Sequence, residues 1–125
     1  MYNEKFMDIA LEEAKLALDE NEVPVGAVIV KDGVVIAKAH NTREKTKNAL
    51  HHAEVIAIDN ACKELSGWRL WQCEMYVTME PCPMCAGAIV NARIPNVYFG
   101  AYEKKYGCHL NTSDAADEAR SVDLG

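Results

Sequence analysis

The chain of 125 residues lacks any apolar run long enough to cross a bilayer. Its start reads "NEKFMDIALEEAK", which is charged and contains no apolar core of signal-peptide length. Basic residues are also scarce, because 13 lysines and arginines stand against 19 aspartates and glutamates, for a formal charge of −6. This balance argues against a protein that holds nucleic acid mainly by diffuse electrostatic attraction, but it leaves room for a local basic patch. We expect a cytoplasmic protein.

The sequence also lacks the even number of cysteines that a fully paired set of disulfides would need. The five cysteines are an odd number, and a reducing compartment disfavours a disulfide framework. Cys82 and Cys85 are therefore candidates for metal binding or catalysis. Cys62, Cys73 and Cys108 have the simpler interpretation of small buried apolar residues.

The periodicity of apolar residues predicts alternating helices and strands. The first helix, residues 4–19, has an expected apolar face of Met7, Leu11, Ala14 and Leu18. Further helices are predicted over residues 51–65 and 83–93, and strands over residues 25–30, 34–39, 73–79 and 96–101. The first two strands form a hairpin in which Gly33 adopts a positive φ.

Strands separated by helices of this length predict parallel pairings and a sheet that is covered on both faces. The fold class is therefore α/β, a three-layer α/β/α sandwich with a central mixed sheet of about five strands. We expect a single domain over residues 1–125, with an atypical short C-terminal tail from about residue 108.

Cys82 and Cys85 have a spacing that suits a metal. At i and i+3 of a helix start, both sulfur atoms can face one point, and the free backbone N–H groups and the helix dipole favour thiolates. His52 would supply a third ligand of the kind that zinc prefers. Three protein ligands leave the fourth tetrahedral position open for water, as in catalytic zinc sites.

Glu54 follows His52 by two residues, so one helix start can deliver a ligand and a carboxylate to the same pocket. Zinc lowers the pKa of a bound water, and Glu54 can take the proton that this water loses. The pattern H-x-E with P-C-x-x-C is an established signature of zinc-dependent nucleobase deaminases, and here it reads "HAE" at 52–54 and "PCPMC" at 81–85.

Each of these residues also has a simpler interpretation. Taken alone, Cys82 and Cys85 could equally well be half of a zinc knuckle or two core cysteines as part of a catalytic site. His51 could replace His52 as the ligand, although only His52 precedes Glu54 by two positions. A structural zinc would need a fourth ligand, and no spacing marks one among the remaining candidates: Cys62, Cys73, Cys108, His40, His51 and His109.

The chain resembles the cytidine deaminase superfamily and, within it, the TadA-type bacterial tRNA adenosine deaminases. The resemblance covers about residues 4–107 and rests on these stretches: "ALEEAKLAL", "EVPVGAVIV", "AHNTRE", "HAEVIAI", "GWRL" and "MYVTMEPCPMCAGAIVNARIPNVYFGA". It implies zinc-dependent hydrolytic deamination of adenosine to inosine in RNA, at the wobble position of a tRNA anticodon loop. It also implies a homodimer.

The resemblance further implies substrate contacts. Asn41 would hydrogen-bond the target base, and Val28 and the backbone of Ala53 would line the base pocket. Lys105 would lie near the bound RNA. The alternatives from the residues alone are a turn or capping role for Asn41, packing for Val28 and Ala53, and a solvated charge for Lys105.

The resemblance ends near residue 107, since the family continues with a basic C-terminal helix and this chain reads "CHLNTSDAADEARSVDLG". That departure and the acidic balance favour an alternative substrate, a free base or nucleoside such as guanine or cytosine. A third hypothesis is a zinc-stabilised interaction module without activity. Such a module would be expected to have lost its proton carrier, whereas Glu54 is present.

Overall fold

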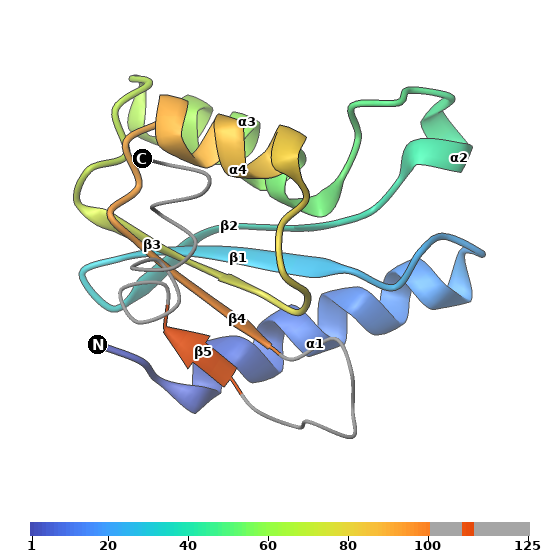
Figure 1. Ribbon diagram of the computed structural model, residues 1–125, viewed down its shortest axis with the longest axis horizontal. Helices are drawn as coiled ribbons and strands as arrows, with labels where there is room; N and C mark the ends of the chain where they lie inside the picture. Colours follow the sequence, from blue (N-terminus) through green and yellow to red (C-terminus); the bar gives the residue numbers. More distant parts are fainter. Residues whose placement is uncertain (101–108, 112–125) are drawn as a thin grey trace.

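A computed structural model describes residues 1–100 and 109–111 of the chain (Figure 1). Its elements follow in the order α1 (Glu4–Asp19), β1 (Gly26–Lys31), β2 (Val34–His40), α2 (Arg43–Thr46), α3 (Ala53–Leu65), β3 (Cys73–Val77), α4 (Pro83–Asn91), β4 (Asn96–Gly100) and β5 (His109–Asn111). Every predicted helix and strand is present. The short helix α2 and the strand β5 were not predicted. None of the helices described here combines the length and apolar character that a bilayer span requires.

The strands form one mixed sheet in the order β2-β1-β3-β4-β5. The β1–β2 hairpin turns at Asp32 and Gly33, which both have a positive φ (52° and 76°), as tight hairpin turns require. The prediction of parallel pairings is correct for β3 and β4 and wrong for β2 and β3, which run in the same direction but are not paired. The reason is that β1 lies between β2 and β3. The connection through α3 therefore joins two strands that run in the same direction but are not neighbours.

The sheet is covered on both faces, as the three-layer class predicts (Figure 1). Helix α1 covers one face, and α3 and α4 cover the other. Alternate residues of β1 enter the two cores: Val28 and Val30 pack with α1, whereas Ala27 and Ile29 pack with α3 and α4. The α/β/α sandwich is thus confirmed for the described residues. The prediction of one domain over residues 1–125 stays a prediction.

Alanines form much of the face that α3 turns toward the sheet. Ala53, Ala57 and Ala61 have no exposed surface and belong to the core on that side. Side chains that end at Cβ let a helix lie close to the strands beneath it. The position of α3, and of the residues at its start, therefore depends on these small side chains.

The buried face of α1 differs from the predicted one. Leu11 and Leu18 are 43% and 59% exposed, and the predicted face holds only for Met7 and Ala14. The buried apolar residues of the helix are Phe6, Met7, Ala10, Ala14 and Ala17. The prediction gave weight to the large leucines, whereas the helix turns a narrower, alanine-rich stripe toward the sheet.

Gly26 explains why that stripe is narrow. A Cβ atom at this position would collide with the carbonyl oxygen of Ala10 and would lie 2.6 Å from the amide nitrogen of Ala14. The backbones of α1 and β1 therefore approach so closely that only glycine fits between them.

We expect Gly26→Ala to lower the free energy of unfolding by about 3 kcal/mol, because α1 must move away from the sheet. Urea titration measures this change. Gly87→Ala is the matched control, since Gly87 lies on α4 with no atom within 4 Å of the added Cβ. There the replacement should leave the stability unchanged or raise it by up to about 1 kcal/mol. Equal effects at both positions would show that α1 does not constrain Gly26.

Candidate active site

The candidate site lies where two helices begin. His52 is the N-cap residue of α3, and Cys82 is the N-cap residue of α4, with Cys85 in the first turn of that helix. Strands β2 and β3 run in the same direction, and α3 and α4 follow them. Both helices consequently start at the same edge of the sheet, which brings together residues 30 positions apart in the sequence.

The three predicted donor atoms have the separations of a zinc site. The Nδ1 atom of His52 lies 3.7 Å from the Sγ atom of Cys82 and 3.5 Å from that of Cys85. Tetrahedral zinc, with bonds of about 2.0 Å to nitrogen and 2.3 Å to sulfur, places such atoms about 3.5 Å apart. The donor types and their spacing therefore fit Zn²⁺.

The electrostatics of the donors also suit a cation. Burial, and then the nearby charge of Arg43, lower the pKa of His52, so the imidazole is neutral, which is the form that binds a metal. Burial raises the pKa of the Cys85 thiol, and the neighbouring Glu54 and Cys82 raise it further. This differs from the expectation that the helix start alone favours the thiolate, because desolvation dominates. A divalent cation at the thiolates supplies the charge that stabilises them.

No fourth protein ligand accompanies these donors within the described ranges 1–100 and 109–111. His51 faces the hydroxyl of Thr46, with 2.7 Å between Nδ1 and Oγ1, and His40 contacts two carboxylates instead. Cys73 is buried in the core and Cys62 packs against it. A three-ligand site with an open position is the arrangement of catalytic zinc.

Glu54 is buried beside these donors. It is 4% exposed, and its carboxyl group hydrogen-bonds with the Cys85 thiol. Burial raises the pKa of this carboxyl group, and the hydrogen bonds that it accepts only partly offset that effect. A carboxyl group whose pKa is shifted toward neutrality, next to a metal site, suits proton transfer.

Asn41 lies at the end of β2 and reaches the start of α3. Its Oδ1 atom accepts a hydrogen bond of 2.9 Å from the backbone N–H of Ala53. The side chain thus caps α3 from another element, so the capping interpretation of Asn41 is part of the structure. Ala53 has no exposed surface and its N–H is bonded to Asn41, which leaves it behind that side chain and not open to a ligand.

The structure does not bring every predicted residue to the site. Val28 was expected to line the base pocket, but it is fully buried on the face of the sheet that packs against α1, away from α3 and α4. The alternation of side chains along β1 turns Val25 and Ala27 to the side of the site instead. Lys105 lies outside the described residues.

The sequence analysis also missed Arg43, whose charge acts on His52. The available signal was the group of basic residues in "TREKTK", shortly before the "HAE" motif.

Comparison with known proteins agrees with this geometry. Residues 1–101 match the cytidine and deoxycytidylate deaminase zinc-binding region, and the chain belongs to this family. The chain is therefore a zinc-dependent hydrolytic deaminase, and zinc is the cofactor that its three donors fit.

Three similar proteins narrow the comparison. The tRNA-specific adenosine deaminase of Bacillus subtilis is 48% identical over 118 residues, which cover 94% of this chain and 73% of that protein. A solved structure from work on A-to-I editing by tRNA:A34 deaminases at the wobble position superposes with a TM-score of 0.78 at 46% identity, covering 79% of this chain and 72% of that one. The structure of guanine deaminase from Bacillus subtilis superposes with a TM-score of 0.77 at 42% identity, covering 81% of this chain and 65% of that one.

We expect Cys85→Ala to lose bound zinc and thermal stability together, because metal binding contributes to the stability of the fold. Metal quantitation on the purified protein, with melting curves recorded with and without a chelator, measures both. Cys62→Ala is the control, since Cys62 lies on α3 away from the donors. It should bind zinc as the wild type does and should still melt earlier when the chelator is added. A Cys85→Ala protein with full zinc content would remove Cys85 from the ligand set.

Proposed function

We propose that this protein deaminates adenosine to inosine in RNA, most specifically at the wobble position of a tRNA anticodon loop. The observation that carries the chemistry is the buried carboxyl group of Glu54 next to the donors His52, Cys82 and Cys85. The 48% identity to a tRNA-specific adenosine deaminase supports the choice of substrate. A base in an anticodon loop is accessible without opening a duplex, as this chemistry requires.

Zinc, when held by His52, Cys82 and Cys85, supplies the Lewis acidity that lowers the pKa of water and stabilises negative charge on oxygen. Glu54 moves the protons. It accepts a proton from the attacking water, gives one to N1 of the adenine ring, and then transfers one to the departing amino group. Water adds at C6, the C6–N bond breaks, and the products are hypoxanthine in the RNA and ammonia. The raised pKa of the Glu54 carboxyl group suits a residue that must both accept and release protons.

Asn41 is proposed to bind the base. Because its Oδ1 atom accepts from Ala53, its amide N–H₂ group is the end that can donate to a ring nitrogen or a carbonyl of the base. The same hydrogen bond fixes the orientation of the amide. Asn41 therefore links substrate binding to the start of the helix that carries His52 and Glu54.

A free base such as guanine is the second candidate substrate. The observation in its favour is the guanine deaminase structure, which is 42% identical and superposes almost as well as the tRNA:A34 deaminase structure. The formal charge of −6 is also compatible with a small substrate. Both reactions use the same metal and the same proton carrier.

Three features of the proposal rest on the resemblance to tRNA adenosine deaminases. They are a homodimer, a cytoplasmic location and the proximity of Lys105 to bound RNA. Arg43, an exposed basic residue of α2 whose charge acts on His52, offers a local cation that a phosphate can contact despite the acidic total.

We expect Glu54→Gln to retain zinc and to lose at least about 100-fold in turnover, because the amide cannot accept the proton. Metal quantitation and single-turnover rates on the same preparation measure the two effects. The matched control is Glu64→Gln, at the far end of the same helix. A Glu54→Gln enzyme within a few-fold of the wild-type rate would exclude Glu54 as the proton carrier.

The two candidate substrates are separable by ammonia release. We expect the wild-type enzyme to release ammonia from an adenosine-containing anticodon stem-loop and to do so far more slowly from guanine, adenosine or cytidine at equal concentration. The stem-loop with inosine already at the wobble position is the blank. Release from guanine alone would overturn the proposed RNA substrate and leave the zinc chemistry intact.

A further inference from the structure

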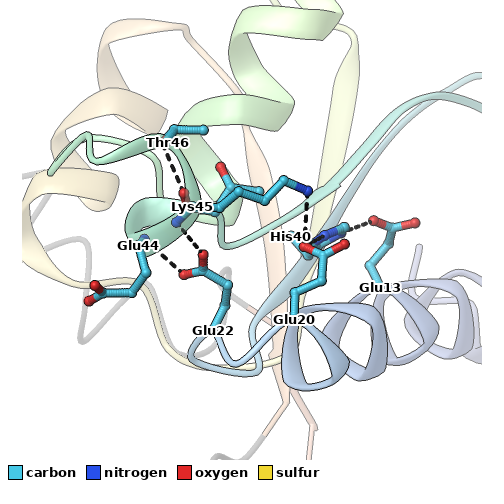
Figure 2. A network of polar contacts seen from close by, with 8 residues as sticks. Glu13, Glu20, Glu22, His40, Glu44, Lys45 and Thr46 are labelled. Atoms are coloured by element: carbon cyan, nitrogen blue, oxygen red, sulfur yellow. Dashed lines mark hydrogen bonds and ion pairs between the residues drawn. The ribbon is translucent and has the colours of Figure 1, made fainter.

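Three glutamates from α1 and the loop that follows it hold the segment of residues 40–45, which we name the 40–45 segment. Figure 2 shows this network: Glu13 and Glu20 lie on either side of His40, and Glu22 lies under the first turn of α2. The segment connects β2 to α2. None of the three glutamates belongs to the set of metal donors.

The first attachment is at His40. Its Nδ1 atom lies 2.8 Å from Glu13 and its Nε2 atom 3.1 Å from Glu20. Burial alone would lower the pKa of His40, but hydrogen bonds to the two carboxylates outweigh it, so the pKa lies above its ordinary value. Lys45 reaches Glu20 as well, at 3.5 Å. An imidazolium that donates from both nitrogens to carboxylates is firmly fixed in orientation.

The second attachment is at Glu22, which is 5% exposed. Its Oε1 atom accepts a hydrogen bond of 3.0 Å from the backbone N–H of Glu44, and its Oε2 atom accepts one of 2.8 Å from the N–H of Lys45. Both oxygens of one buried carboxylate are thus used on two consecutive amides. Charge-assisted bonds to backbone N–H groups are among the stronger hydrogen bonds in proteins.

Asn41 lies between these two attachments. Its backbone N–H donates to the carbonyl of Val25 at 3.2 Å, and its side chain accepts from Ala53. The neighbouring Thr42 donates to the carbonyl of His51 at 3.1 Å, which closes the loop that returns to α3. The position of Asn41 relative to α3 consequently depends on where the 40–45 segment is held.

We propose that Glu22 is a positioning residue for the deamination site, which fixes Asn41 against the start of α3 through its two hydrogen bonds to α2. The His40 attachment holds the other end of the same segment. Glu22 touches neither the donors nor the site of the base, so it acts through Asn41. The expected effect of Glu22 on KM rests on the proposed function. Its effect on the position of Asn41 rests on the hydrogen-bond geometry alone.

The structural consequence is tested by amide hydrogen exchange on the zinc-loaded protein. In Glu22→Ala we expect the amides of Glu44, Lys45 and also Ala53 to exchange at least tenfold faster, while amides of α4 keep their wild-type rates. Glu12→Ala is the control, because Glu12 is an exposed glutamate of α1. An unchanged rate for Ala53 in Glu22→Ala would overturn the proposal, whether or not the enzyme acts on RNA.

The kinetic consequence is tested with a graded series on the substrate that the wild type turns over. Glu22→Ala removes both acceptor oxygens, whereas Glu22→Gln keeps one, so KM should rise in the order wild type, Gln, Ala, by about tenfold or more in Ala, with kcat changed much less. Zinc content should stay at the wild-type level. A lower melting temperature with wild-type KM would show a purely structural role and overturn the proposal. A series that behaves as expected on guanine but not on the stem-loop would support Glu22 and reject only the RNA substrate.

Discussion

The common direction of β2 and β3 is the constraint on which the site depends. A helix that follows a strand in this fold returns antiparallel to it, so two strands with one direction give two helices that start at one edge. The metal donors come from those two starts. β1 lies between the strands and separates them without reversing either one. The zinc-binding geometry is thus a consequence of connectivity, and the donor residues exploit an edge that the topology already provides.

Burying the negatively charged groups of the site at this edge is electrostatically unfavourable, and a bound cation offsets that cost. Two thiolates and a carboxylate are unfavourable in a desolvated pocket, and the raised pKa values of Cys85 and Glu54 report that cost. With neutral His52, two thiolates balance the charge of Zn²⁺. Of the described side chains at the site, Glu54 is then the one whose protonation can change during turnover without disrupting the metal.

The local features of the fold could be predicted from the sequence, and the tertiary ones only in part. The periodicity located all four main strands, and the H-x-E and C-x-x-C motifs pointed to residues that the structure brings together. The errors concern choices that periodicity cannot make. Leu18 is exposed because α1 packs closely over Gly26 and turns its alanine-rich face, and not its leucines, toward the sheet. Val28 faces α1 because the register of β1 decides its side, and the contacts of Glu22 with α2 link elements that no short-range pattern connects.

The alanine face of α3 limits how this enzyme can change over evolutionary time. Ala53, Ala57 and Ala61 already hold the helix about as near to the sheet as side chains allow, and only glycine is smaller. Apart from glycine, every substitution along this face introduces a larger side chain, which would push α3 away from the sheet. His52 caps α3, whereas Cys82 and Cys85 lie at the start of α4, so such a shift would change the distances between the metal donors. Binding of the metal thus depends on packing positions as far along α3 as Ala61, about two and a half turns from His52.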